Sequence, residues 1–284
     1  MKKLRAFIDL TRVGHGVMLC IAIFIGALIA GDVPELGKYV FAFLTALFLE
    51  MGTFALNDYF DYEVDKKNRR MDRPLVRGDL SPKTALLAYA VLSPLGIISS
   101  IMVNRTCFYI AFFNLVVATL YDVKLKEIKI IGNFYIAFIM AIPFIFGAVA
   151  VSEEIPSIIY LFALLAFLSG AGREIIKDVM DFEGDKIRKT KSFPYYLGIK
   201  KSNFMASLLI IMAVIMSFIP FLFNFDERYY HSMLFLSLLI PSDTIFVYSI
   251  YLAIKNDARA RKYTLFAMLI ALLAFLIPSL TFIK

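Results

Sequence analysis

The sequence predicts an all-α polytopic membrane protein, a single domain of residues 1–284 with nine transmembrane helices. Hydrophobic residues make up 60% of the chain and charged residues 19%, whereas ordinary soluble domains contain about 25% charged residues. The mean hydropathy is +0.76. Apolar segments of about 20 residues, enough to cross a hydrocarbon core of about 30 Å, recur along the chain. They leave no room for a separate soluble domain.

The nine expected helices are the apolar runs between polar breaks, each close to the length that spans a bilayer. The first follows a basic arm, the second and the sixth end in acidic segments, and the third and the seventh follow the longest polar connections. In chain order they are 13–30, 39–60, 83–103, 106–122, 131–151, 155–178, 202–224, 231–254 and 263–283.

Positive charge predicts the orientation of these helices. Of the 30 Lys and Arg residues, 24 fall in the N-terminal arm and in alternate connections, and only four fall on the opposite side. Positive residues are retained in the cytoplasm during membrane insertion. We therefore expect a cytoplasmic N-terminus, a C-terminus outside, and the long charged connections on the cytoplasmic face.

Two acidic segments share the same spacing of aspartates, and each lies at the expected cytoplasmic end of a helix. The segments Asn57–Asp65 and Asp178–Asp185 each have aspartates separated by three and then four residues. On a helix these positions share a face, where carboxylates repel one another unless a cation lies between them. Hard oxygen ligands suit Mg²⁺ shared with phosphates, so two or more ions around one diphosphate are expected. The expected metal ligands are Asp58, Asp61, Asp65, Asp178, Asp181 and Asp185.

Acidic residues at membrane depth are also compatible with two alternatives. A solvated helix end with fortuitous acidic residues accounts for one such segment, but poorly for two with identical spacing, because intramembrane acids are costly and usually functional. A cation-coupled transporter is the second alternative, since such proteins combine intramembrane acids with an internal repeat.

Basic residues accompany the first acidic segment. Arg73 and Arg77 follow it within one short loop, and a guanidinium fork suits phosphate oxygens. Tyr121, Lys124 and Lys126 end the fourth helix on the same side of the membrane. A topological role explains the two lysines equally well.

Further polar positions lie within predicted helices. Arg173 and Lys177 precede the second acidic segment, and a buried arginine needs a partner, which Glu174, Asp178 or a phosphate would supply. Three more polar residues lie in the predicted membrane region. His15 is expected to have a structural role, and Glu50 is expected to line a cavity. Asp243 either bonds to backbone groups freed by Pro241 or lines the cavity.

These segments, in this order, resemble the UbiA-type intramembrane prenyltransferase superfamily. The resemblance rests on the two acidic segments, the Arg73-Pro74-Leu75 loop, and Tyr121-x-x-Lys124 with Gly132-Asn133 after it, and it covers nearly the whole chain. It implies nine helices around a central cavity, acidic segments facing each other across its cytoplasmic mouth, and a lateral opening toward lipid for a prenyl tail.

Within the superfamily, the run 171–186 is similar to archaeal digeranylgeranylglyceryl phosphate synthases. That similarity implies transfer of a geranylgeranyl group from geranylgeranyl diphosphate to geranylgeranylglyceryl phosphate, which makes the second ether bond of archaeal lipids. The segment 191–198 departs from the small-residue Thr-Leu-Pro type segment of relatives. An aromatic acceptor, a quinone precursor or a tetrapyrrole, is the alternative.

Spacing and resemblance together imply a mechanism in which an allylic C–O bond ionises while metal ions and cationic side chains stabilise the departing diphosphate. The acceptor proton passes to Asp58, Asp61 or diphosphate. The expected catalytic residues are Asp58, Asp61, Asp181, Lys124 and Tyr121, and the expected substrate-binding residues are Asn57, Arg73, Arg77, Lys126, Arg173, Lys177 and Asn133. We expect a multi-pass cell-membrane protein that opens to the cytoplasm, with a prenyl diphosphate, a lipid-like acceptor and membrane lipids as partners and no nucleic acid.

Overall fold

The computed structural model describes residues 2–31, 36–124, 129–187 and 191–281, and within these ranges the chain is helical with short connections. The helices are α1 Lys2–Thr11, α2 Val13–Ala30, α3 Leu36–Lys67, α4 Pro74–Arg77, α5 Pro82–Val103, α6 Arg105–Val123, α7 Lys129–Val151, α8 Ser157–Ile187, α9 Phe193–Ser217, α10 Ile219–Leu222, α11 Met233–Ile254 and α12 Ala260–Leu280. Nine helices of the described ranges are long and apolar enough to cross a membrane, which confirms the predicted number of spans.

The basic arm before the first span forms an additional helix, α1, which was not predicted from the sequence. Its Ala6, Leu10 and Thr11 side chains are buried, whereas the basic residues of its first turns are exposed. Arg12 has left-handed backbone angles, φ 46° and ψ 47°, which an L-residue adopts only singly. This residue makes the corner that separates α1 from α2.

Three helices differ in extent from the prediction. α3 has 32 residues, about 48 Å, and therefore extends beyond a hydrocarbon core of about 30 Å. α8 likewise continues through its acidic segment instead of ending at residue 178. α9 begins at Phe193, before the expected residue 202, and Gly198 kinks its first turns with φ 75°. Carboxylates near a helix C-terminus oppose the helix dipole, so the ends of α3 and α8 depend on neighbouring cations.

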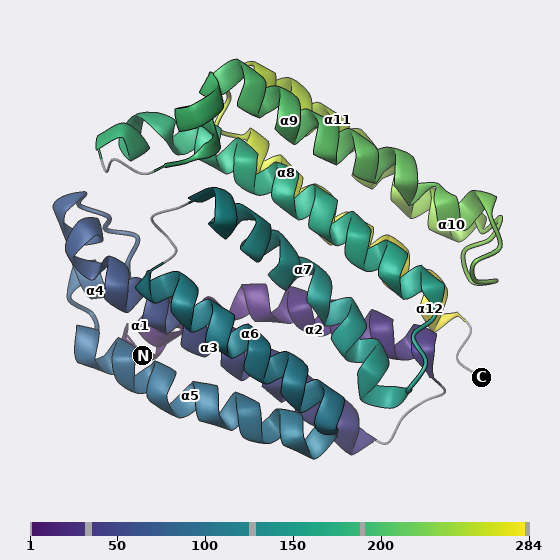
Figure 1. Cartoon of the computed structure of the whole chain (residues 1–284), viewed down its shortest axis with the longest axis horizontal. Helices are drawn as coiled ribbons and strands as arrows, with labels where there is room; N and C mark the ends of the chain where they lie inside the picture. Colours follow the sequence, from purple (N-terminus) through teal and green to yellow (C-terminus); the bar gives the residue numbers. More distant parts are fainter. Residues whose placement is uncertain (1, 32–35, 125–128, 188–190, 282–284) are drawn as a thin grey trace.

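The spanning helices form two groups that meet along α2 and α7 (Figure 1). α3, α5 and α6 lie on one side, and α8, α9, α11 and α12 lie on the other. α2 packs against α3, α7 and α12, while α7 also packs against α6 and α8. This arrangement places the two helices with acidic segments, α3 and α8, around one interior cavity.

α2 and α7 approach closely at two glycines. A Cβ atom added to Gly26 would overlap the carbonyl oxygen of Phe144, and one added to Gly147 would overlap that of Ile23. Helices in membranes gain van der Waals contact where small residues let their backbones meet. Because Gly26 and Gly147 have no side chains, the backbones of α2 and α7 can pack in direct contact.

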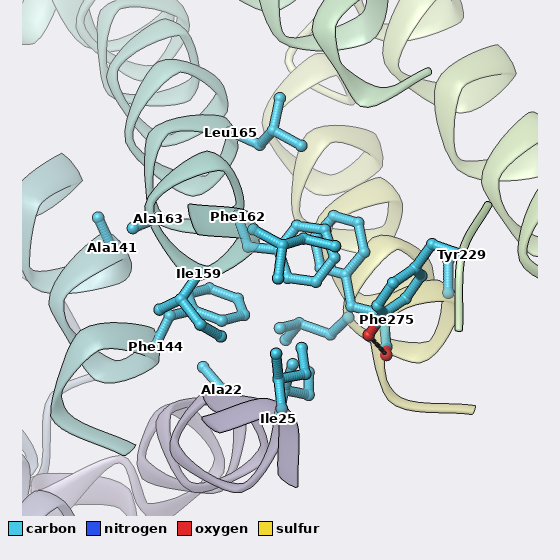
Figure 2. Close-up of a cluster of buried hydrophobic side chains, with 14 of the residues drawn as sticks. Ala22, Ile25, Ala141, Phe144, Ile159, Phe162, Ala163, Leu165, Tyr229 and Phe275 are labelled. Atoms are coloured by element: carbon cyan, nitrogen blue, oxygen red, sulfur yellow. Dashed lines mark hydrogen bonds between the residues drawn. The ribbon is translucent and has the colours of Figure 1, made fainter. Parts of the chain in front are cut away.

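The main hydrophobic cluster joins side chains of α2, α7, α8, α11 and α12, and Figure 2 shows part of it. The rings of Phe162 and Phe275 stack with centroids 4.0 Å apart. The hydroxyl of Tyr229, a fully buried residue, donates a 2.7 Å hydrogen bond to the carbonyl oxygen of Phe275. Phe144, Leu165 and Phe275 of this cluster also line the cavity and form its apolar end.

Candidate active site

The interior cavity has a volume of about 520 Å³ and two chemically different ends. Its apolar part is lined by aliphatic and aromatic side chains of α2, α7, α8, α11 and α12. Its charged and polar lining residues include Arg12, His15, Glu50, Asn57, Asp61, Arg73, Tyr121, Asp122, Arg173, Glu174, Lys177 and Asp243. Most of these lie near the acidic ends of α3 and α8. The cavity therefore suits an amphiphile with an anionic head and a long apolar chain.

Arginines surround the first acidic segment. Asp58 is 2% exposed, and its Oδ1 atom accepts a 2.7 Å hydrogen bond from Arg12 and lies 3.2 Å from Arg73 Nη1. Asp65 lies about two helical turns after Asp58 on α3. Arg73 Nε lies 3.5 Å from Asp65, and Arg70 lies 3.9 Å from it. These cations offset the repulsion between carboxylates on one face of α3, which is why the helix continues to Lys67.

Two other residues of this segment face the cavity. Asn57 and Asp61, one turn apart on α3, both line it. The Asn57 amide donates a 2.8 Å hydrogen bond to Asp122 on α6, which joins the two helices at the charged end. Tyr121 lines the cavity beside Asp122, and its ring lies 5.3 Å from that of Tyr135. The charged end thus includes aromatic faces.

The second acidic segment has its own partners. Asp178 is buried, accepts a 2.7 Å hydrogen bond from Asn133 and lies 3.4 Å from the ammonium group of Lys129. Asp181 is half-exposed and lies 3.5 Å from Arg261. Asn133 and Lys129 belong to the first turns of α7, so α7 fixes the position of Asp178.

In the part of α8 that directly precedes Asp178, Arg173 and Lys177 both form ion pairs with one carboxylate, that of Glu174. Glu174 is 3% exposed; Arg173 donates a 2.6 Å hydrogen bond to its Oε1 atom, and Lys177 donates a 2.8 Å hydrogen bond to its Oε2 atom. All three residues line the cavity. Glu174 is thus the partner of Arg173, one of the three partners that the sequence left open.

Surface ion pairs hold the connection after α3. Partial burial raises the pKa of Asp72, but the hydrogen bond from Arg70 and its positive charge outweigh this effect, so the pKa lies below its ordinary value. Arg77 donates hydrogen bonds to Asp9 on α1 and to Asp79. Arg77 was expected to bind substrate; in the structure it lies outside the cavity lining and ties α1 to the turn after α4.

The chemistry of the carboxylates suits Mg²⁺. No three His, Cys, Asp or Glu side chains in the described ranges are grouped closely enough to hold a metal ion by themselves. The Oδ2 atom of Asp58 is buried and has no hydrogen-bond partner among the residues that the structure describes, and an unsatisfied buried oxygen is costly. Mg²⁺ usually takes one or two carboxylates and completes its shell with water and phosphate. The residues therefore fit an ion that arrives with a substrate.

The other predicted site residues divide into three groups. Glu50, His15 and Asp243 line the cavity, as predicted for Glu50; Asp243 also accepts a 2.8 Å hydrogen bond from Ser217. Lys124 is exposed at the end of α6, outside the cavity lining. Lys126 lies outside the described residues, as does the side chain of Asp185.

Sequence reasoning missed three residues of the site. Arg12 was interpreted only as a topological charge, although it is the last basic residue before the first apolar run. Asp122 pairs with Asn57 across 65 positions and Lys129 pairs with Asp178 across 49, separations for which a single sequence carries no signal. Adjacency to Tyr121 was the one available hint for Asp122.

Comparison with known proteins gives relatives over the full length. Digeranylgeranylglyceryl phosphate synthase of Archaeoglobus fulgidus is 41% identical over 285 aligned residues, which cover 96% of this chain and 94% of the relative. A solved structure of a digeranylgeranylglyceryl phosphate synthase has a TM-score of 0.78 at 31% identity and covers 99% of this chain and 100% of its own.

A more distant structure shares the fold. A UbiA homologue from Archaeoglobus fulgidus, bound to GPP and Mg²⁺, has a TM-score of 0.71 at 18% identity, over 98% of this chain and 99% of its own. The sequence pattern described as the UbiA prenyltransferase family matches residues 19–273. Because the pattern spans most of the sequence, this chain belongs to the UbiA prenyltransferase family.

Proposed function

We propose that this protein transfers a geranylgeranyl group from geranylgeranyl diphosphate to geranylgeranylglyceryl phosphate and releases diphosphate. The observation that carries the proposal is a single cavity with a charged end and an apolar end. Its charged end is lined by Asn57 and Asp61 of the first acidic segment and by residues of α8 just before the second segment, and its apolar end is lined by aliphatic and aromatic side chains. A prenyl diphosphate has the same division between an anionic head and an apolar tail. The 41% identity to a relative named digeranylgeranylglyceryl phosphate synthase supports the choice of acceptor.

Two or more Mg²⁺ ions would be held at the charged end by Asp58, Asp61 and Asp65 of α3 and by Asp178, Asp181 and Asp185 of α8. When bound, the ions supply compensation for the charge that grows on the departing diphosphate. The buried, unpartnered Oδ2 atom of Asp58 supports this assignment, and so does the UbiA homologue bound to GPP and Mg²⁺.

The chain's own side chains neutralise and orient the leaving group. Arg73, next to Asp58 and Asp65, offers the planar pair of donors of its guanidinium group to phosphate oxygens. Lys124, directly after α6, and Lys126, which lies outside the described residues, add positive charge. Asn57 and Asn133 hold the acidic segments through their amide hydrogen bonds. Preorganised charges of this kind contribute the larger part of many enzymatic accelerations.

The bond between C1 of the donor and the diphosphate oxygen breaks, and its electron pair leaves with diphosphate. The acceptor's hydroxyl oxygen bonds to C1 and makes the ether, while the hydroxyl proton passes to Asp58, Asp61 or the released diphosphate. The ring of Tyr121 faces the cavity and stabilises positive charge on the allylic carbon.

The protein would lie in the cell membrane as one domain, with its N-terminus and the charged end of the cavity toward the cytoplasm. The excess of Lys and Arg in the N-terminal arm and in alternate connections supports this orientation. Cytoplasmic access also suits a soluble diphosphate product.

The test is an assay of the purified full-length protein with geranylgeranyl diphosphate, Mg²⁺ and one acceptor at a time. Transfer to geranylgeranylglyceryl phosphate, with one diphosphate released per ether formed, is the expected result. Transfer only to hydroxybenzoate-type acceptors would make the protein an aromatic prenyltransferase. Absence of diphosphate release with every acceptor, together with Mg²⁺-independent cation flux in vesicles, would make it a transporter.

A further inference from the structure

We propose that Arg173 and Lys177 bind the phosphate group of the acceptor, and that Glu174 is a positioning residue that holds them. The inference rests on the proposed function for the presence of a phosphorylated acceptor. In this proposal the cationic side chains next to α3 bind the diphosphate of the donor, and the two cationic side chains on α8 bind the phosphate of the acceptor.

The charge of this cluster does not balance within itself. Two cations hydrogen-bond to the two oxygens of one carboxylate, so Arg173, Glu174 and Lys177 together carry a net positive charge. A structural ion pair requires only one cation for each carboxylate. The second cation, placed in the lining of the cavity, favours an anionic ligand there.

Arg173 also has an unused donor. Its side chain is 13% exposed, and its Nε atom is buried without a hydrogen-bond partner among the described residues. A buried donor that makes no hydrogen bond costs free energy, and the guanidinium fork matches phosphate oxygens in two-point contact. A phosphate in the cavity would contact the exposed part of this guanidinium group, and a rotation of the side chain would bring the buried Nε atom into the two-point contact.

Hydrophobic packing on the opposite face of α8 leaves the side chains of Arg173, Glu174 and Lys177 on the cavity face of the helix. Ile175 and Ile176 are buried in a hydrophobic cluster with residues of α9 and α11. Arg173, Glu174 and Lys177 are left on the cavity side of the helix. Residues 173 and 177 are one turn apart, so their cationic groups present neighbouring contacts to a single ligand.

The depth of the cluster suits the acceptor better than the donor. Arg173 lies five and eight residues before Asp178 and Asp181, about 7.5 and 12 Å along the helix axis toward the apolar end. Lys177 directly precedes Asp178, but its ammonium group lies 2.8 Å from Glu174, the neighbour of Arg173. With the diphosphate held at the acidic segments and the prenyl chain extended inward, C1 lies on the apolar side of the diphosphate. An attacking hydroxyl must approach C1 on this side, and the acceptor's phosphate is attached to the adjacent glycerol carbon.

The donor's charge has other partners. Arg12 and Arg73 surround Asp58 and Asp65 on α3, and Lys129 pairs with Asp178. These cations stand at the level of the acidic segments, where the metal-bound diphosphate is proposed to lie. Arg173 and Lys177 therefore remain as the cavity-lining pair on α8 for a second anion.

Steady-state kinetics of the Arg173→Gln variant test the proposal. With geranylgeranylglyceryl phosphate, we expect the KM for the acceptor to rise about tenfold to a hundredfold, as expected for losing hydrogen bonds to a charged group. The KM for geranylgeranyl diphosphate should stay within about twofold. With geranylgeranylglycerol, which lacks the phosphate, the variant and the wild type should have the same kcat/KM, because the removed interaction is absent from both. Lys177→Gln should give the same pattern.

Two further variants separate binding from folding. Arg173→Gln combined with Glu174→Gln removes both charges of the buried pair and should show the same selective loss for the phosphorylated acceptor. Arg259→Gln, on an exposed arginine of the connection between α11 and α12, should leave all constants unchanged. As a readout independent of turnover, glycerol 1-phosphate should raise the Tm of wild type in detergent but not that of Arg173→Gln.

Two outcomes would overturn the inference while leaving the proposed function intact. One is a rise in the KM for the diphosphate donor equal to that for the acceptor. The other is an equal loss of kcat/KM with phosphorylated and phosphate-free acceptors. Failure of the wild type to use either glycerol-based acceptor would instead contradict the proposed function.

Discussion

The guanidinium group of Arg12 donates a 2.7 Å hydrogen bond to Oδ1 of Asp58, and the Arg12 guanidinium carbon lies 4.3 Å from the ring centre of Phe54. Arg12 is the left-handed corner between α1 and α2, so this contact joins the N-terminal helix to the first acidic segment. A cation therefore already stands at a proposed metal ligand before any ion binds.

Arg12→Gln should destabilise the metal-free protein, because it leaves a buried carboxylate with less compensation. Leaving a buried charge with no partner costs about 3–5 kcal/mol, and because Arg73 remains 3.2 Å from Asp58 the loss here should be smaller. The Tm in detergent with EDTA should fall, and Mg²⁺ with diphosphate should recover part of the loss by supplying a replacement cation at Asp58. Arg5→Gln, on the exposed side of α1, is the matched control. An identical decrease in both variants, unaffected by Mg²⁺, would show that Arg12 does not compensate Asp58.

The Arg73→Lys variant tests whether the planar guanidinium group of Arg73 is needed, or only its positive charge. Lysine retains the positive charge but lacks the planar pair of donors that lets Arg73 approach both Asp58 and Asp65. We expect kcat/KM for the diphosphate donor to fall about tenfold or more. Arg105→Lys, at the exposed start of α6 and the opposite end of the bundle, should have wild-type kinetics. Full activity of Arg73→Lys would mean that a point charge suffices there.

Gly147→Ala should destabilise the protein through the contact of α7 with α2. The added methyl group would overlap the carbonyl oxygen of Ile23, and inserting atoms into a packed interface typically costs about 1–3 kcal/mol. Gly37→Ala is the control, since an added Cβ there meets no atom within 4 Å. Thermal unfolding in detergent measures both; equal Tm values for the two variants would contradict the close approach of the helices.

The Tyr229→Phe variant tests whether the hydrophobic cluster around Tyr229 contributes to stability without contributing to the catalytic step. The variant loses hydrogen bonds to the carbonyl oxygen of Phe275 and to Ser279, worth about 1 kcal/mol each, and keeps the ring packing. The Tm should fall while kcat stays close to that of wild type. A large loss of kcat with unchanged Tm would place this end of the bundle in the catalytic step.

Much of the fold could be predicted from residue order alone. Length and hydropathy determine the spanning helices, and the first of them was predicted with the bounds of α2, Val13–Ala30. The helix ends at the charged face were not predicted, because α3 and α8 are continued by ion pairs with distant residues such as Arg73 and Lys129. The helix α1 was missed because ten residues are too few to span a bilayer.

The site was predictable where its residues share one helix and much less where they do not. Regular spacing pointed to the aspartates of α3, of which Asp61 lines the cavity, and their role as metal ligands stays a prediction. The contact of Asn57 with Asp122 depends on how α3 packs against α6, which no local pattern encodes. Arg77 shows the reverse case: its position in the sequence suggests phosphate binding, but Asp9 on α1 binds its guanidinium group.

The central claim, that both acidic segments act on one diphosphate, is tested most directly by Mg²⁺-dependent diphosphate release from geranylgeranyl diphosphate with Asp61→Asn and Asp181→Asn. Asparagine keeps the shape but removes the charge that holds the ion, so each variant should lose about a hundredfold or more in kcat. Glu154→Gln, on the exposed connection before α8, should match wild type. Full turnover by either aspartate variant would contradict a site built from both segments.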